Sequence, residues 1–351
     1  MSGHTHDHID WADRLVLLRA ADTLDAPAQA AIAARLVAKL PANPTVIDLG
    51  CGAGGMSTHF AQALATQHGG TIILVDATPE LLHEAERAVL AAADAAQNNR
   101  ADNPAFPPER GGHVATDGDG DHRTSDAGSS NHTAAAGGSG SEVSSNHTAA
   151  TGSRAPTVEV RAIVADLADS ALPDLLPAAD LVWASRVVHH LPDQQAAIGT
   201  LAAVARAGGV VALAEGGLSF SCLPWDLGVG RPGLEDRLQA AQAEWFVGMR
   251  EGIDGAVPMP YGWTVALERA GLADVSSFSA LVDHPAPGPD GLTDYVHHHL
   301  SRLATHGADH LADEDRATLA SLLDPDSSHY LGKRRDLFLL GARTVHHGRR
   351  S

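Results

Sequence analysis

The 351-residue sequence has little of several features that mark common classes of protein. Its two cysteines, Cys51 and Cys222, are too few for a disulfide framework or a cysteine-rich zinc module, and they favour a reducing compartment. No apolar run approaches the ~20 residues of a membrane-spanning helix, and the polar, acidic start lacks the pattern of an export signal. We therefore expect a soluble, cytoplasmic protein without a membrane partner.

Positive charge and aromatic side chains are also scarce. The chain has 24 Lys and Arg against 43 Asp and Glu, a formal net charge of -19, and only 4% of its residues are aromatic. A surface this negative repels phosphate backbones, so we expect no nucleic-acid partner. Hydrophobic residues make up 44% of the chain, which is enough for a globular core. The expected partner is a small-molecule substrate, and the oligomeric state stays open.

Short apolar runs alternate with helical patterns on both sides of a long polar segment. The expected strands are 45–49, 71–75, 158–164, 181–184, 210–214, 275–282 and 337–345. The expected helices are 10–21, 26–40, one beginning near Met56, 79–96, 194–206 and a helical block over 291–323, with a turn at Gly208-Gly209. Strands that alternate with helices indicate a parallel sheet with right-handed crossovers.

Residues 97–156 differ from the rest of the chain in composition. They are mainly Gly, Ser, Asp, Asn, His and Ala, and a seven-residue stretch that begins at Ser129 recurs at Ser144. Such a segment cannot bury enough apolar surface to offset the entropy lost on ordering. We predict a disordered, low-complexity insertion here, and a mobile tail over residues 1–9.

A glycine-rich turn after the first expected strand indicates a ligand site. Gly50, Gly52 and Gly54 would let a ligand approach the backbone at the beginning of a helix. Asp76, at the end of the next strand, has the spacing of a ribose-binding carboxylate. The turn lacks both a Walker lysine and the last glycine of the dinucleotide pattern. Asp48, just before the turn, is a poor neighbour for a pyrophosphate and a good one for a cation.

Five segments, in the correct order, resemble the motifs of class I S-adenosylmethionine-dependent methyltransferases. They are Val46–Gly55, Val75–Leu82, Ala165–Leu167 (the adenine-contacting segment), Ala184–Pro192 and Ala207–Val210. The resemblance implies an α/β, Rossmann-like, seven-stranded sheet with helices on both faces, an antiparallel last strand and helical lid insertions. It also implies S-adenosyl-L-methionine as the cofactor, whose sulfonium and lack of phosphate agree with the argument from Asp48.

The resemblance also divides the chain into four parts. Residues 1–44 would be a tail and helices that cover the cofactor site, and residues 45–96 with 157–217 would form the cofactor-binding core. The insertion at 97–156 interrupts this core. Residues 218–351 would supply the substrate lid helices and the final strands of the sheet.

The cofactor contacts implied by the resemblance lie at the ends of the first four strands. Asp48 and Gly50 would lie by the methionine portion, and Gly52 and Gly54 would let the backbone approach the cofactor. Asp76 would accept hydrogen bonds from the ribose hydroxyls. The other implied contacts are Ala77, Asp166, Leu167 and Ser185.

Methyl transfer from a sulfonium needs little covalent help, because the leaving group is already good. A base is needed only when the acceptor must first lose a proton. The candidate catalytic residues are His189 and His190, which follow the fourth strand, and Glu215, which ends the fifth. The absence of an Asn/Asp-Pro-Pro-aromatic motif disfavours amines of nucleic-acid bases as acceptors. We expect transfer to an oxygen or carbon of a small, specialised metabolite.

The later part of the chain carries candidate substrate contacts. Three tryptophans within one insertion either form an apolar lid or pack in the core, and three arginines either anchor a substrate carboxylate or lie on the solvated surface. The tryptophans are Trp225, Trp245 and Trp263, and the arginines are Arg231, Arg237 and Arg250.

Three other functions stay open. One is metal-assisted C-methylation of an α-keto acid. His297, His298 and His299 cannot all bind one ion on a helix, but one of them could join His189 or His190. We assign no metal site, and we expect a disordered tail around the N-terminal histidines, His4, His6 and His8. The others are an NAD-dependent oxidoreductase, which Asp48 and the missing glycine disfavour, and a non-catalytic cofactor-binding protein.

Overall fold

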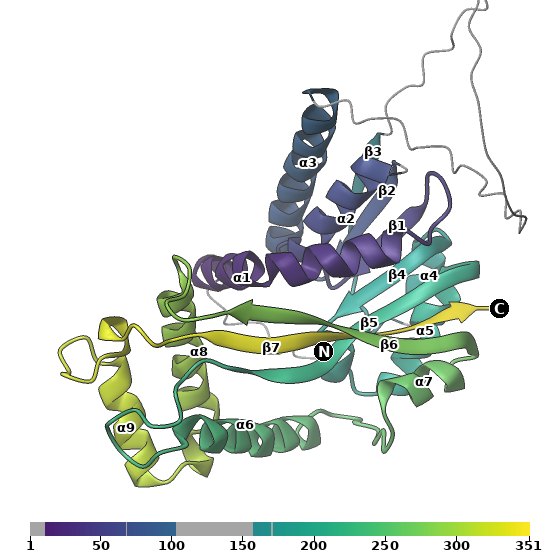
Figure 1. Ribbon diagram of the computed structural model, residues 1–351. Helices are drawn as coiled ribbons and strands as arrows, with labels where there is room; N and C mark the ends of the chain where they lie inside the picture. Colours follow the sequence, from purple (N-terminus) through teal and green to yellow (C-terminus); the bar gives the residue numbers. More distant parts are fainter. Residues whose placement is uncertain (1–10, 68, 103–156, 170) are drawn as a thin grey trace, which may run out of the picture. The chain divides into compact units, whose positions relative to one another are not determined.

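The computed structural model describes residues 11–67, 69–102, 157–169 and 171–351. Among them, seven strands form one sheet in the order β3-β2-β1-β4-β5-β7-β6 (Figure 1). The strands are β1 Thr45–Leu49, β2 Gly70–Asp76, β3 Val158–Val164, β4 Ala179–Ser185, β5 Ala205–Ser221, β6 Leu272–His284 and β7 Leu339–Arg350. β7 is antiparallel to both of its neighbours, while β1 to β5 pair in parallel. The predicted seven-stranded sheet with an antiparallel last strand is therefore confirmed.

The helices connect and cover these strands. They are α1 Trp11–Val37, α2 Gly55–Gln67, α3 Pro79–Asp102, α4 Leu172–Leu175, α5 Gln194–Val204, α6 Leu234–Glu251, α7 Trp263–Arg269, α8 Leu292–His306 and α9 Asp313–Leu323. Short 3-10 turns occupy Val188–His190, Ala308–His310 and Leu331–Lys333. None of the helices in the described ranges is both long and apolar enough to cross a membrane.

The central strands are buried on both faces, as is typical of a parallel sheet covered by helices. In β1, Val46 packs into the apolar cluster with α1, α2 and α3, whereas Ile47 and Leu49 pack into the cluster with α5 and α7. A third cluster joins α6, α8 and α9. Because helices cover both faces of the sheet, polar contacts with a ligand are expected at the carboxyl ends of these strands.

The N-terminal region forms one helix and not the two that the sequence predicts. α1 continues through Pro27, which lacks the N–H of a regular helical bond. Leu24, Ala28 and Ile32 lie on both sides of this proline and are all buried. Burial of this continuous apolar face offsets the lost hydrogen bond.

The turn predicted at Gly208-Gly209 lies inside a longer strand. β5 pairs with β4 at Ala205, shifts register, and pairs again from Val210 onward. Gly208 has a left-handed φ of 75°, so the glycines form a bulge within the strand. At its other end β5 continues to Ser221 because β7 supplies an antiparallel partner there.

The boundary predicted for the insertion also changes. α3 extends to Asp102, so residues 97–102 are helical rather than part of the low-complexity segment. The remainder of that prediction, residues 103–156, lies outside the described residues, as does the predicted tail over residues 1–9.

Candidate functional site

The glycine-rich turn satisfies its own backbone donors. The N–H groups of Gly50 and Cys51 donate to the carbonyl of Val75 at 2.8 and 3.1 Å, and Gly54 N–H donates to Cys51 at 2.9 Å. Gly52 N–H donates to Oδ2 of Asp76 at 2.9 Å. A loop that binds a diphosphate directs such N–H groups at the ligand. Because these four are bonded within the protein, the turn fits a ligand without phosphate.

Each glycine of the turn has a different neighbour. A Cβ on Gly50 would lie 2.5 Å from Cγ2 of Val187, and one on Gly54 would lie 2.9 Å from Cα of Ala85 in α3. Gly52 has no atom within 4 Å of that position and has a φ of 53°. Gly50 and Gly54 therefore allow close packing of protein on protein, and Gly52 leaves open space above the backbone.

Asp48 is a buried carboxyl group directly beneath this turn. It is 3% exposed and accepts a hydrogen bond of 2.5 Å from the hydroxyl of Ser57. Burial raises the pKa of Asp48 to about 7, and the negative charges of Asp76 and Asp22 act in the same direction. A cation bound nearby would favour the ionised form, so Asp48 suits a positively charged ligand.

Two more carboxylates lie at the same edge of the sheet. Asp76 accepts N–H bonds from Gly52 and Thr78, both at 2.9 Å, and Asp166 accepts one from Ala168 at 2.9 Å. Both carboxylates are half-buried. A carboxylate oxygen that accepts one hydrogen bond has capacity for another, so Asp76 and Asp166 remain able to bind hydroxyl or amino groups of a ligand.

The other predicted cofactor contacts surround these carboxylates. Ala77 is exposed directly after β2, and Leu167 is half-buried against the α5 side of the core. Ser185 is half-buried at the end of β4, where it pairs with Ala214 of β5. The structure thus positions all three at the ends of strands, as the sequence predicts.

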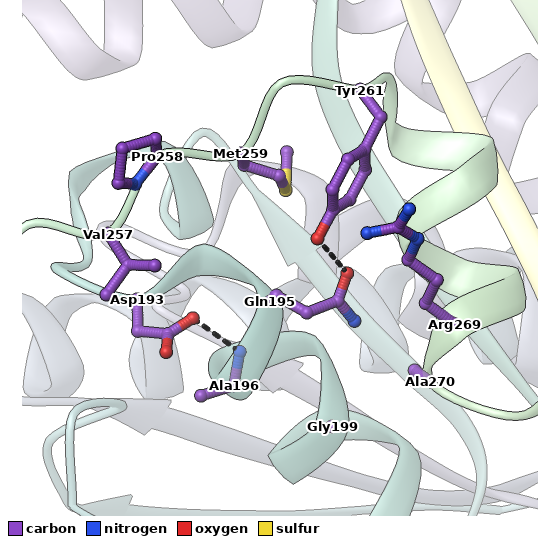
Figure 2. A pocket seen from close by; sticks show the side chains of 10 residues that line it. All are labelled: Asp193, Gln195, Ala196, Gly199, Val257, Pro258, Met259, Tyr261, Arg269 and Ala270. Carbon is purple, nitrogen blue, oxygen red and sulfur yellow. Dashed lines mark hydrogen bonds between the residues drawn. The ribbon is translucent and has the colours of Figure 1, made fainter.

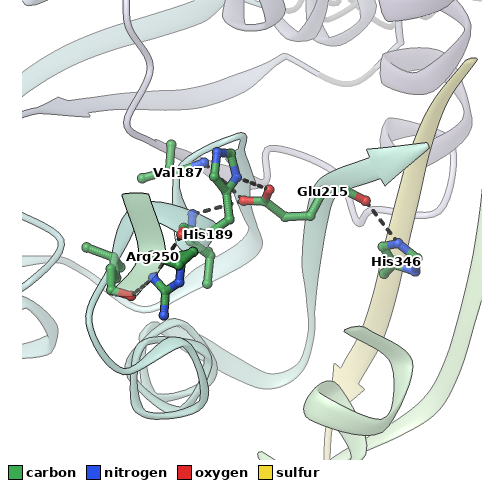
Figure 3. A network of polar contacts seen from close by, with 7 residues as sticks. Val187, His189, Glu215, Arg250 and His346 are labelled. Atoms are coloured by element: carbon green, nitrogen blue, oxygen red, sulfur yellow. Dashed lines mark hydrogen bonds and ion pairs between the residues drawn. The ribbon is translucent and has the colours of Figure 1, made fainter. Parts of the chain in front are cut away.

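A histidine–glutamate pair joins the segment after β4 to the middle of β5 (Figure 3). Glu215 does not end the fifth strand, as the sequence predicts, but directly follows the part of β5 that pairs with β4. Nδ1 of His189 is 2.6 Å from Oε2 of Glu215, which is only 1% exposed. Oε1 of the same carboxylate accepts the N–H groups of Val187 and Val188 at 3.0 and 2.9 Å. The carbonyl of Glu215 is 3.2 Å from Nε2 of His346. Glu215 therefore holds both the ring of His189 and the backbone that carries it.

Arg250, in α6, binds the backbone of the segment that carries His189 and is not an exposed anchor for a substrate. Its guanidinium donates to the carbonyls of His189, Leu191 and Pro192 at 3.0, 2.7 and 3.3 Å (Figure 3). These contacts join residues about 60 positions apart, and no local sequence pattern indicates them.

Arg237 also has partners within the protein. It donates two hydrogen bonds to Asp315, at 2.8 and 2.7 Å, and others to the carbonyls of Arg231 and Pro232. Of the three arginines considered for a substrate carboxylate, Arg237 and Arg250 are thus engaged in structural contacts. Arg231 is exposed.

The three tryptophans do not form one lid. Trp225 is 70% exposed, Trp245 stacks on His306 with ring centroids 4.1 Å apart, and Trp263 packs against the core near α5. The lid prediction was wrong because proximity in sequence did not bring these side chains onto one surface.

Two rings lie beside His189. The ring of His190 is 4.0 Å from that of His189, and Phe246 of α6 is 5.7 Å from it. His190 is exposed, whereas His189 and Phe246 are half-buried. The sequence gives no indication of Phe246, because α6 reaches this segment only through the fold.

The metal grouping of histidines that was considered as an alternative is not formed within the described parts of the chain. No three His, Cys, Asp or Glu side chains there are arranged to hold one ion. Nε2 of His297 is 3.2 Å from the carbonyl of Leu323, and burial lowers the pKa of His299 to about 4. His4, His6 and His8 lie outside the described residues.

A cavity of about 500 Å³ lies beside the start of α5 and the end of α7 (Figure 2). In it the hydroxyl of Tyr261 donates to Gln195 at 3.0 Å. The lining residues are Asp193, Gln195, Ala196, Gly199, Val257, Pro258, Met259, Tyr261, Arg269 and Ala270. None of the predicted cofactor or catalytic residues lines this cavity, so it is separate from the site described above.

Comparisons with known proteins address the family of the chain. A family model described as a methyltransferase domain matches residues 23–277. The fold is similar to that of S-adenosylmethionine-dependent methyltransferases from Thiobacillus denitrificans (15% identity, 90% of each chain, TM-score 0.38) and Geobacter sulfurreducens (14% identity, 90% of this chain and 89% of that one, TM-score 0.38), both in complex with S-adenosylhomocysteine. No curated protein matches the sequence.

Proposed function

Because the chain belongs to the methyltransferase-domain family and is an S-adenosylmethionine-dependent enzyme, we propose that it methylates an oxygen or carbon atom of a small-molecule metabolite. The observation that carries this proposal is the hydrogen bond of 2.6 Å between His189 and buried Glu215. Val187, two residues before His189, packs directly on Gly50 of the glycine-rich turn. A histidine suited to proton transfer thus belongs to the segment that touches the cofactor turn.

The side chains and the open backbone around the glycine-rich turn fit this cofactor. When bound, it supplies a methyl group on a positively charged sulfur that leaves as a neutral thioether. Asp48 would compensate positive charge on the methionine portion, and open Gly52 would permit close approach. Asp76 would accept the ribose hydroxyls and Asp166 the adenine amino group. These carboxylates can accept hydrogen bonds and compensate positive charge, and the cofactor offers a positive charge, hydroxyl groups and an amino group.

His189 would act as the general base. The Glu215 carboxylate would accept a hydrogen bond from Nδ1–H, which keeps this proton on the ring and leaves Nε2 as the unprotonated nitrogen of a neutral imidazole. Nε2 can then take the proton from an acceptor hydroxyl or C–H group as the new bond to the methyl carbon forms. Glu215 stabilises the positive charge that His189 gains in this step.

The test is a metabolite-pool incubation with isotopically labelled methyl donor, using the wild-type protein, Glu215→Gln, His189→Gln and His190→Gln. We expect label transfer by the wild type, and roughly a hundredfold or greater loss in the first two variants. The change of Glu215 should also alter the pH profile of the rate, which a purely structural role would not do. His190→Gln removes a neighbouring ring and should retain most activity.

Calorimetry with S-adenosylhomocysteine separates catalysis from cofactor binding. The Glu215 and His189 variants should bind this product with the affinity of the wild type. Absence of label transfer by the wild type would contradict the proposed function. Full activity of Glu215→Gln with an unchanged pH profile would contradict the role of the pair while leaving the enzyme class intact.

A further inference from the structure

Arg186 has an unusual position at the end of β4. It is the first residue after the strand, and its N–H donates to the carbonyl of Ala214 at 3.1 Å. Its φ is 55°, in the left-handed region that a residue with a long side chain rarely adopts. Such backbone conformations are costly and concentrate at functional sites. The conformation fixes where this side chain leaves the sheet.

The Arg186 side chain is exposed to water, yet burial by the surrounding protein lowers its pKa. A side chain that water reaches although protein surrounds it lies in a recess. The charged and titratable groups that interact with it electrostatically come from three other elements. They are Asp22 and Asp25 of α1, Tyr295 of α8 and Arg343 of β7.

The positive charge of Arg186 has no direct partner among the residues that the structure describes. Its guanidinium forms no hydrogen bond or ion pair with them, and the acidic groups that interact with it electrostatically are occupied in other ways. Asp25 accepts hydrogen bonds from Nε and Nη2 of Arg343 at 3.0 and 2.5 Å. Asp22 accepts one from Gln29 at 3.3 Å, and burial raises its pKa, which favours its neutral form. A guanidinium partly removed from water without an anion is unfavourable, so the recess is suited to an anionic ligand.

The recess adjoins the proposed cofactor site. The carboxyl of Asp22 lies 2.2 to 2.3 Å from where a Cβ on Gly55 would stand, so it touches the first residue of α2. On the other side, Val187 packs on Gly50 in the same way. His189 follows three residues after Arg186 on this segment. A ligand held by Arg186 is therefore beside the turn and on the segment that carries the proposed base.

We propose that Arg186 binds a carboxylate of the methyl acceptor, so that the substrate is an organic acid. This inference rests on the proposed function. The planar guanidinium matches a carboxylate with two parallel hydrogen bonds. The hydroxyl of Tyr295 is a further donor in the recess.

Binding of simple probes tests this without knowledge of the substrate. Acetate and benzoate, each paired with its neutral amide, are titrated into the S-adenosylhomocysteine complex and followed by ligand-observed NMR. The variants are Arg186→Gln, Arg186→Lys and the control Arg335→Gln, which changes an exposed arginine elsewhere. We expect the wild type and the control to prefer the carboxylates by tenfold or more. Arg186→Gln should lose that preference, and Arg186→Lys should retain part of it.

Two outcomes overturn the proposal. One is a wild-type complex that binds the acids no better than the amides, or an Arg186→Gln variant that keeps the preference. The other is a tenfold or greater loss of S-adenosylhomocysteine affinity in Arg186→Gln, which would assign Arg186 to the carboxylate of the cofactor itself.

Activity provides an independent readout. The labelled product of the pool incubation should bind an anion exchanger at neutral pH, and Arg186→Gln should raise KM more than it lowers kcat. A neutral labelled product would refute the organic-acid substrate while leaving the methyltransferase function intact. Failure of the proposed function shows itself differently, as no labelled product at all.

Discussion

Replacing Asp48 by asparagine should stabilise the cofactor-free protein at neutral pH and weaken its affinity for the cofactor. The carboxyl is 3% exposed, and burial raises its pKa from an ordinary 3.8 to about 7. Asparagine has the same shape and retains an oxygen that can accept the bond from Ser57. The substitution therefore removes the ionisation without removing the packing or the hydrogen bond.

The magnitude follows from linkage between protonation and folding. Because its pKa is raised on folding, Asp48 binds its proton more tightly in the folded state than in the unfolded state. The associated stability is fully present below pH ~4 and is lost as the pH rises through about 7. The gap between 3.8 and about 7, at ~1.36 kcal/mol per pH unit, corresponds to about 4 kcal/mol. This is an upper bound on what Asp48→Asn gains at high pH.

Urea unfolding at several pH values measures this effect. The difference in unfolding free energy between Asp48→Asn and the wild type should grow by about 1.4 kcal/mol per pH unit between about pH 4 and 7, and then level off. Asp290→Asn, which removes an exposed carboxylate, serves as the control and should show little change. A difference for Asp48→Asn that is the same at every pH would refute the reasoning, because ionisation would then not be what the fold opposes.

Three other predictions concern Asp48, Gly54 and Asp25. S-adenosylmethionine binding near pH 6 should release protons from Asp48, seen as a buffer-dependent binding enthalpy that vanishes in Asp48→Asn, whereas S-adenosylhomocysteine, which lacks the sulfonium, should release fewer. Gly54→Ala should lower the unfolding free energy by roughly 1–3 kcal/mol in urea, because φ is 85° and the new Cβ would lie 2.9 Å from the backbone of α3; an unchanged midpoint would contradict this. Asp25→Asn should cost up to roughly 3–5 kcal/mol, since half-buried Arg343 would lose the carboxylate that compensates its charge, and a loss below 1 kcal/mol would show that the pair is not desolvated.

The parts of the fold that depend on local patterns could be predicted from the sequence. The alternation of strands and helices gave the sheet, and β3 begins and ends where the apolar run predicts. The glycine turn and Asp76 follow from spacing, because the ends of adjacent parallel strands meet at one edge. The pairing of His189 with Glu215 follows for the same reason, since β4 and β5 are neighbours.

The features that sequence could not give depend on contacts between distant segments. Whether α1 continues through Pro27 depends on what its apolar face packs against. Arg250 and Phe246 reach His189 from α6 only after the chain has folded. The environment of Arg186 combines α1, α8 and β7, so neither its lack of a carboxylate partner among the described residues nor its recess has a signature near position 186.

Under the proposed function, the reaction would change which ligand charge the site favours. Carboxylates at the ends of β1 and β2 favour a cationic donor, whereas the guanidinium of Arg186 favours an anionic acceptor. In the proposed function, each reactant would be attracted to its own side of the site. Methyl transfer would remove the positive charge from sulfur, so Asp48 would lose the cation that favours its ionised form. Protonation of Asp48, whose pKa burial raises, would then become more favourable and would weaken the affinity for the spent cofactor. Asp48 would in this way link methyl transfer to product release, which neither a permanent charge nor a neutral residue at this position would do.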